Sequence, residues 1–209
     1  MFPIFLDLTG HLCVIVGGGL VAVRKADALL AAGAAVRVVC LEPALPIGLS
    51  DWRTEPYRPD HLNGATLVFA AATPEVNRQV VADARARGLW VNSATEPGAG
   101  DFILPATVRR GEFVLAVSTG GASPGVAAAI RRRLEEQFDD AFGEWVAVLS
   151  EMRPIILSRP AQAQQRRDLF EKLSRWEWLE RLRREGPDVV RAAMRAEVEA
   201  ALPPSGDPV

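Results

Sequence analysis

Residues 11–22 read HLCVIVGGGLVA and join an apolar run to three consecutive glycines. The run is rich in β-branched side chains, which is typical of a strand buried on both faces of a sheet. Apolar residues follow the glycines at helical spacing, and Gly33 is placed to end that helix. The stretch therefore predicts a strand, a tight turn and a helix in direct succession.

The small residues of this turn match the pattern G-x-G-x-x-A of dinucleotide-binding proteins. Gly17 permits the tight turn, Gly19 lets the backbone approach a pyrophosphate, and Ala22 lets the helix pack on the strand. The helix N-terminus supplies N–H donors for the anion. A glycine turn is also an ordinary way to join a strand to a helix, but a second apolar strand at residues 35–40 completes a βαβ unit. We therefore predict dinucleotide binding.

Further alternation of strands and helices predicts a doubly wound parallel sheet. Residues 65–72 and 89–92 are strand-like, with a helix between them, and residues 3–8 predict a short strand ahead of the glycine turn. Ligands of such sheets bind beyond the carboxyl ends of the strands. The cofactor contacts expected at that edge are Gly17, Gly18, Gly19, Leu20, Val21, Cys40, Glu42, Ala72 and Thr73.

The end of the second strand decides how the adenosine ribose is bound. In dinucleotide folds an acidic residue near this point takes the ribose hydroxyls. Here Cys40 stands where an acid is expected, and Glu42 follows two residues later. The choice between NAD and NADP therefore stays open, with NAD as the expected cofactor.

The alternation stops near Asp101. Residues 102–108 and 113–118 are apolar runs joined by four residues, too few for a crossover helix, and they predict an antiparallel hairpin. Beyond it, apolar residues at helical spacing predict helices, one of them spanning 169–182. The expected parts are a Rossmann-like dinucleotide-binding domain at 1–100, a hairpin and helix region at 101–145, a helical domain at 146–202 and a flexible tail at 203–209.

Composition narrows the class of protein. A formal net charge of −2 gives no reason to expect nucleic acid as a partner. Cys13 and Cys40 both fall in predicted buried strands, so neither a disulfide nor a zinc site is expected. No apolar run is long enough for a membrane span, and the first residues lack a basic region for secretion. We expect a cytoplasmic protein that binds no membrane.

Several motifs together resemble one family, that of precorrin-2 dehydrogenase and the amino-terminal module of siroheme synthase. The resemblance covers most of residues 1–145 and, more loosely, the helical remainder. It is carried by Pro3-Ile4-Phe5, Val16-Gly17-Gly18-Gly19, Val21-Ala22, Arg24-Lys25, Ala72-Thr73, Asn77, Asn92, Asp101-Phe102, Pro105-Ala106 and residues 117–124, which read VSTGGASP.

This resemblance implies NAD-dependent oxidation of precorrin-2 to sirohydrochlorin, and in some members insertion of ferrous iron. It also implies a homodimer formed through the hairpin and the following helices, with the tetrapyrrole in a cleft beside the dinucleotide domain. The arginines can equally be solvated, and the loop at 119–123 can equally be a joint with a helix cap. The implied substrate contacts are Arg24, Lys25, Asn92, Arg109, Thr119, Gly120, Gly121 and Ser123.

One position departs from the family pattern. Thr95 stands where the family has its catalytic aspartate, three residues after Asn92. A threonine hydroxyl cannot serve as a general base or an anionic metal ligand near neutral pH. Glu96 is the first candidate to replace the carboxylate and Asp101 the second, although Glu96 can be an ordinary loop acid and Asp101 can fix the loop backbone.

Three functions remain open from the sequence. The first is a precorrin-2 dehydrogenase. Its oxidation step can proceed without that carboxylate, because positioning the substrate against the nicotinamide supplies much of the rate. Iron insertion is expected to be weak or absent, because no metal-ligand cluster is apparent and neither His11 nor His61 belongs to a motif. The second is a catalytically silent NAD or tetrapyrrole carrier or sensor, and the third is another small-molecule dehydrogenase.

Overall fold

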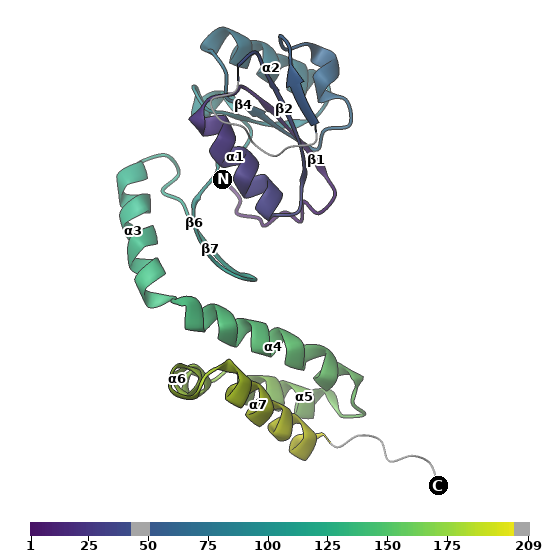
Figure 1. Cartoon of the computed structure of the whole chain (residues 1–209), viewed down its shortest axis with the longest axis vertical. Coiled ribbons are helices and arrows are strands. Elements are labelled where there is room, and N and C mark those ends of the chain that lie inside the picture. The colour runs from purple at the N-terminus through teal and green to yellow at the C-terminus, as the bar shows by residue number, and fades with distance from the viewer. Residues whose placement is uncertain (43–50, 203–209) are drawn as a thin grey trace. The chain divides into compact units, whose positions relative to one another are not determined.

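The computed structural model describes residues 1–42 and 51–202 (Figure 1). The chain divides into two compact units, Met1–Leu104 and Pro105–Val209. The predicted tail at 203–209 lies outside the described residues. The division falls four residues beyond the boundary predicted after residue 100, and the hairpin and the later helices share one unit. The finer division of that unit at residue 145 stays a prediction.

The first unit is built on a parallel sheet of the order β3-β2-β1-β4-β5. Every neighbouring pair of strands in it is parallel. The strands are β1 (Leu12–Val16), β2 (Ala35–Cys40), β3 (Asp51–Thr54), β4 (Leu67–Ala70) and β5 (Trp90–Ser93), joined in part by α1 (Leu20–Ala31), α2 (Pro74–Ala86) and two short 3₁₀ helices, η1 (Pro59–Leu62) and η2 (Pro97–Ala99). This confirms the doubly wound α/β fold predicted from the sequence.

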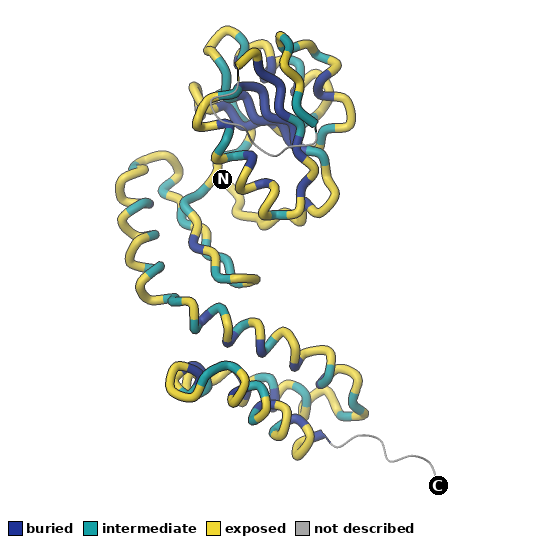
Figure 2. Tube along the Cα trace, in the orientation of Figure 1, coloured by how far each residue is buried: buried dark blue, intermediate teal, exposed yellow. Residues whose placement is uncertain are grey.

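The sheet carries a separate apolar core on each face, because successive side chains of a strand point to opposite sides. Cys13 and Ile15 of β1 pack with Ala26 of α1, whereas Val14 and Val16 pack with the side chains of α2. Figure 2 shows these strands as a nearly continuous buried region. Burial on both faces explains why β1 reads as an unbroken apolar run instead of an alternating one.

The strand order reverses between β1 and β4. From β1 the chain moves through α1 to β2 on one side, and after β3 it returns to place β4 on the other side of β1. The carboxyl ends of β1 and β4 are the point where loops diverge to opposite faces of such a sheet, and this is where open α/β sheets bind ligands. The glycine turn follows β1 directly at this point.

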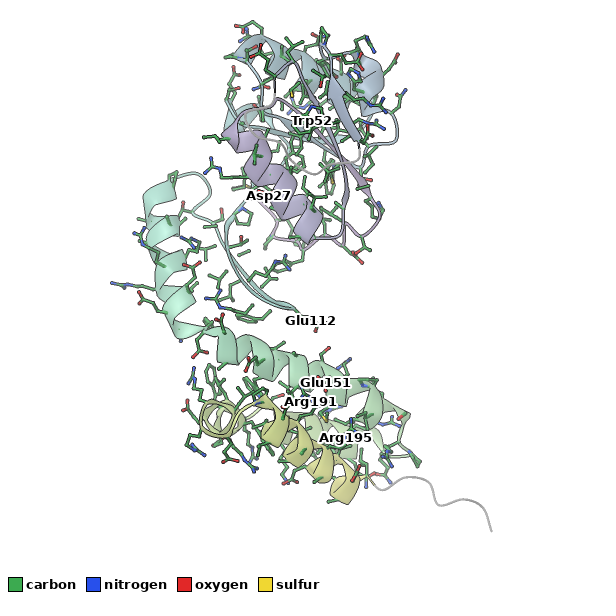
Figure 3. All side chains as sticks on the ribbon, viewed as in Figure 1. Asp27, Trp52, Glu112, Glu151, Arg191 and Arg195 are labelled. Atoms are coloured by element: carbon green, nitrogen blue, oxygen red, sulfur yellow. The ribbon has the colours of Figure 1, made fainter. Side chains whose placement is uncertain are left out.

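The second unit contains the predicted antiparallel hairpin of β6 (Ala106–Arg110) and β7 (Phe113–Val117). Its helices are α3 (Pro124–Gln137), α4 (Asp140–Ser158), α5 (Ala163–Leu173), α6 (Trp176–Glu185) and α7 (Pro187–Ala201). Buried residues from Phe142 to Leu202 form its core. Arg191 of α7 and Glu151 of α4, both labelled in Figure 3, form an ion pair at 2.9 Å between Nε and Oε2.

Two predicted elements differ from the structure. The helix predicted over 169–182 is broken at Ser174, where α5 ends, and the indole N–H of Trp178 donates to the Lys172 carbonyl at 3.1 Å. Apolar spacing continues across this break, so periodicity alone could not reveal it. Residues 3–8 are not a strand, because they pair with no strand in the described part of the chain, and Phe5 is exposed.

Candidate functional site

The first glycine of the turn packs directly against the end of β4. Gly17 has a φ of +129°, and its N–H donates to the Val39 carbonyl at 2.8 Å. A Cβ built on Gly17 would lie 2.2 Å from the carbonyl oxygen of Ala71. Only glycine fits here, because both the backbone conformation and the contact exclude a side chain.

The second glycine packs against the end of β2. A Cβ on Gly18 would lie 2.4 Å from the Glu42 carbonyl oxygen and 2.7 Å from Cys40 Sγ. Burial raises the pKa of the Cys40 thiol, which keeps it neutral. Cys40 and Glu42, both predicted as cofactor contacts, thus lie beside the turn. Cys40 is buried there and the Glu42 residue is exposed.

The third glycine faces open space. Gly19 is the N-cap of α1, and no described side chain caps the helix there. A Cβ on Gly19 would meet no atom of residues 1–42 or 51–202 within 4 Å. The first N–H groups of a helix lack intrahelical partners, so this end offers donors and room to an anion. Leu20 and Val21, the first two residues of α1, are both exposed beside the turn.

Asn77 of α2 joins the ends of β4 and β5. It is 2% exposed, and its Oδ1 accepts the Ala72 N–H at 2.8 Å. Its Nδ2 donates to the Ala72 carbonyl at 3.1 Å and to Thr95 Oγ1 at 3.1 Å. Thr73, beside Ala72, caps α2 by accepting the Val76 N–H at 3.5 Å.

Asn77 is absent from the site residues predicted from the sequence, although it carried part of the resemblance. A signal for it was present. An asparagine one turn after the cap of an amphipathic helix, on the same face as Val80, Val81 and Ala84, must find hydrogen-bond partners when it is buried. The sequence could not say that one of those partners is Thr95.

Lys25 and Asn92, both predicted as substrate contacts, contact each other. Lys25 Nζ donates to Asn92 Oδ1 at 2.9 Å, and Asn92 Nδ2 donates to the Phe102 carbonyl at 2.9 Å. The Lys25 ammonium lies 5.4 Å from the centre of the Phe69 ring. Burial, and secondarily the charge of Arg24, lowers the pKa of Lys25. Arg24 itself is exposed.

The two candidate carboxylates have different surroundings. Glu96 is exposed, with Oε1 at 3.8 Å from Arg78 Nη1, and its N–H donates to Ser93 Oγ at 3.2 Å. Asp101 Oδ1 pairs with Arg85 Nη2 at 3.0 Å, while its Oδ2 accepts the Val91 N–H at 3.0 Å. The two oxygens of Asp101 therefore fix the loop to α2 and to β5, as expected if this residue holds the loop backbone.

The remaining predicted substrate contacts lie in the second unit. Arg109 is exposed on β6. In the loop before α3, Ser123 Oγ accepts the Val126 N–H at 3.3 Å, and the Ser123 N–H donates to Thr119 Oγ1 at 3.1 Å. Gly120 and Gly121 have φ values of +66° and +89°, which glycine adopts without strain. The loop is thus a capped entry into α3.

Metal-ligand clusters and membrane spans are both missing from the described part of the chain. In residues 1–42 and 51–202, no three side chains of His, Cys, Asp or Glu lie together in a way that could hold a metal ion. None of the helices described has both the length and the apolar character needed to cross a membrane.

Fold and turn together define an NAD(P)-binding protein of the Rossmann-like class. Residues 4–106 match a family model described as "Putative NAD(P)-binding", and residues 115–137 match one described as "Sirohaem biosynthesis protein central". The second match covers the end of the hairpin and α3.

Two siroheme synthases are similar to this chain over most of its length. A siroheme synthase of Chromobacterium violaceum is 38% identical over 98% of this chain and 44% of its own length. A siroheme synthase of Methylobacillus flagellatus is 39% identical over 81% of this chain and 38% of its own length. The chain belongs to the siroheme synthase family, and it spans less than half the length of these curated relatives.

A solved structure shows the same fold. The precorrin-2 dehydrogenase SirC superimposes with a TM-score of 0.79 over 96% of this chain and 100% of its own, at 24% sequence identity. At that identity the likeness establishes the fold, including the hairpin and the helices that follow the sheet.

Proposed function

We propose that the chain is an NAD-dependent precorrin-2 dehydrogenase that forms sirohydrochlorin. The observation that carries the proposal is the N-terminus of α1 at Gly19. No described side chain caps it, a Cβ on Gly19 would face open space, and it lies at the point where the strand order reverses. This arrangement suits a pyrophosphate, and family membership supplies the tetrapyrrole as substrate.

The reaction removes two electrons and two protons from the macrocycle. Precorrin-2 and NAD⁺ give sirohydrochlorin, NADH and a proton, so one hydrogen leaves with the electron pair as hydride and the other leaves to solvent or a base. The nicotinamide supplies the hydride acceptor when bound. The chain contributes a rigid edge, since Gly17 and Gly18 lock the turn to β4 and β2.

NAD is the preferred cofactor in this proposal because Glu42 lies two residues beyond the end of β2. A carboxylate there accepts hydrogen bonds from ribose hydroxyls and repels the extra phosphate of NADP. Titration of NADH and NADPH by their fluorescence tests this preference. We expect NADH to bind more tightly, and Glu42→Gln to reduce the difference. Equal affinities in the unaltered protein would remove the argument from Glu42.

Iron insertion is not part of the proposed activity. The step needs groups that take pyrrole protons or hold the metal, and Thr95 supplies neither. We expect sirohydrochlorin with Fe²⁺ or Co²⁺ to give no faster metallation with the protein than without it. A Thr95→Asp variant provides the matched comparison, because it restores a carboxylate at that position.

Thr95 also favours one alternative, a silent carrier or sensor. That function requires NADH or sirohydrochlorin to bind without turnover. An anaerobic assay with precorrin-2 and NAD separates the two. Turnover by the unaltered protein supports the dehydrogenase, whereas turnover by Thr95→Asp alone supports the silent binder.

A homodimer is the assembly we propose, with the face around α3 as the contact. Val126 and Ile130 of α3 are 50% and 40% exposed, and Ala127 is the buried residue of that helix. Exposed apolar side chains one turn apart are suited to pairing with a second copy. Light scattering after size exclusion should give twice the chain mass, and Ile130→Glu should give a monomer.

A further inference from the structure

The amide of Asn77 has only one possible orientation. The Ala72 N–H can only donate, so the atom that receives it at 2.8 Å must be the amide oxygen. Nδ2 then faces the Ala72 carbonyl, which can only accept. The two backbone groups of one residue therefore fix the amide from both sides, without reference to Thr95.

This orientation determines the role of the Thr95 hydroxyl. Nδ2 lies 3.1 Å from Thr95 Oγ1, and an amide nitrogen donates and does not accept. Thr95 Oγ1 is therefore the acceptor in this contact, which leaves its own proton free for another partner. Thr95 is exposed, so that proton is accessible to a ligand.

The position of Thr95 indicates which part of a ligand it meets. The residue follows β5, and Asn77 ties it to the end of β4. In dinucleotide folds the adenosine half lies toward β2, on the other side of β1, so the nicotinamide half and the substrate lie toward β4 and β5.

We propose that Thr95 is a hydrogen-bond donor to an acceptor oxygen of the bound ligand, with Asn77 as the residue that positions it. A carboxylate at this position would accept hydrogen bonds, whereas this hydroxyl donates one. The acceptor has two possible sources, the carboxamide of the nicotinamide and a carboxylate of the tetrapyrrole. The inference rests on the proposed function only for the identity of these ligands.

The first test compares Thr95→Val with Thr95→Ser by equilibrium binding, which needs no turnover. The probes are NADH, ADP-ribose, which lacks the nicotinamide, and sirohydrochlorin. Thr66→Val is the control. Thr66 is exposed and precedes β4, so it lies at the amino ends of the strands, whereas Thr95 follows the carboxyl end of β5. We expect Thr95→Val to weaken one ligand roughly threefold to tenfold, and Thr95→Ser and Thr66→Val to leave it unchanged.

The pattern identifies the acceptor. A loss for NADH without a loss for ADP-ribose assigns it to the carboxamide, and a loss for sirohydrochlorin assigns it to the tetrapyrrole. Unchanged binding of both NADH and sirohydrochlorin by Thr95→Val would overturn the proposal. Failure of the unaltered protein to oxidise precorrin-2 would instead count against the proposed function and leave these affinities interpretable.

The second test reverses the hydrogen bond. Asn77→Asp replaces the donor by an acceptor, so the Thr95 hydroxyl turns its proton toward the new carboxylate and withdraws it from the ligand. We expect the ligand weakened by Thr95→Val to be weakened by Asn77→Asp as well, and the double variant to show no further loss. A merely structural role for Asn77 would give additive losses, and this would contradict the coupling. If Asn77→Asp does not fold, the comparison of Thr95→Val with Thr95→Ser still decides.

Discussion

Three consecutive glycines have three different surroundings, and these separate folding from binding at single positions. Gly17 and Gly18 face protein backbone, whereas Gly19 faces open space. The sequence predicted the turn and the pyrophosphate contact of Gly19. It could not predict the contact of Gly18 with Cys40 and Glu42, because that contact depends on where the end of β2 lies.

Gly17→Ala and Gly19→Ala should therefore behave as opposites. We expect Gly17→Ala to lower the free energy of unfolding by about 3 kcal/mol or more, from the clash with Ala71 and the positive φ. Gly19→Ala should change it by less than about 1 kcal/mol. Its Cβ occupies the proposed pyrophosphate space, so NADH affinity should fall on the order of tenfold or more.

Thermal unfolding and NADH fluorescence measure the two effects separately. Unchanged NADH binding by a folded Gly19→Ala variant would contradict the placement of the pyrophosphate.

Asp101 provides a second test at the residue scale. Because its carboxylate binds Arg85 and the Val91 N–H, we expect Asp101→Asn to lower the free energy of unfolding by about 1–2 kcal/mol. If the chain has the proposed activity, the kcat of the folded variant should stay within about threefold of that of the unaltered protein, since a group that only fixes a loop makes no contact with the transition state. A loss of kcat of about a hundredfold with unchanged stability would instead make Asp101 catalytic.

At the scale of elements, the sequence predicted some helices and strands correctly and others wrongly. The apolar runs of β1 and β4 predicted their burial, and the helix cap considered for the loop at 119–123 is found at Ser123, ahead of α3. The strand predicted at residues 3–8 is wrong, because an alternating pattern does not reveal whether a partner strand lies beside it. The single helix predicted over 169–182 is wrong, because apolar spacing continues across the end of α5 at Ser174. The Asn77–Thr95 contact depends on how α2 and β5 pack, which a single sequence does not state.

The pair of β2 and β3 carries a predicted pH dependence. Arg37 of β2 lies beside Asp51 of β3 in register, with Nε at 2.7 Å from Oδ2. Burial of Asp51 acts to raise its pKa, but hydrogen bonds and charges from Arg37 and Arg53 outweigh burial and hold the pKa below its ordinary value.

A lowered folded-state pKa means that the unfolded chain binds the proton first as pH falls. The stabilisation by Asp51 should therefore be complete above the unfolded pKa of about 4 and disappear as pH falls through the folded pKa. Urea unfolding of the unaltered protein and Asp51→Asn at several pH values measures this. We expect a difference of about 1 kcal/mol or less near neutrality that shrinks below pH ~4. A difference that grows on acidification would contradict the assigned shift.

At the scale of the whole molecule, the chain consists of two units with separate cores. The cores of the first unit lie on either side of the sheet, and that of the second lies among α4, α5, α6 and α7. The predicted contact residues are divided in the same way, with the glycine turn in the first unit and Arg109 and the loop before α3 in the second. The parts predicted from the sequence, 1–100 and 101–145, already divide the two groups, and the packing adds that each unit has its own core.

Separate cores predict separate responses to a cavity. Ile156 of α4 is fully buried in the second unit, so Ile156→Ala should destabilise that unit by about 2–5 kcal/mol. In calorimetry of the full chain we expect one transition to move while the other keeps its midpoint. NADH affinity should be unchanged, because the glycine turn lies in the first unit. Two transitions that move together would mean that the units unfold as one.

The most direct test of the central claim is the stoichiometry of the proposed reaction. Purified protein is incubated anaerobically with precorrin-2 and NAD⁺, and NADH and sirohydrochlorin are followed together by absorbance. We expect one NADH for each sirohydrochlorin, no product without NAD⁺, and no change of rate on adding Fe²⁺. Binding of NADH and sirohydrochlorin without formation of either product would contradict the dehydrogenase and leave a ligand-binding protein in its place.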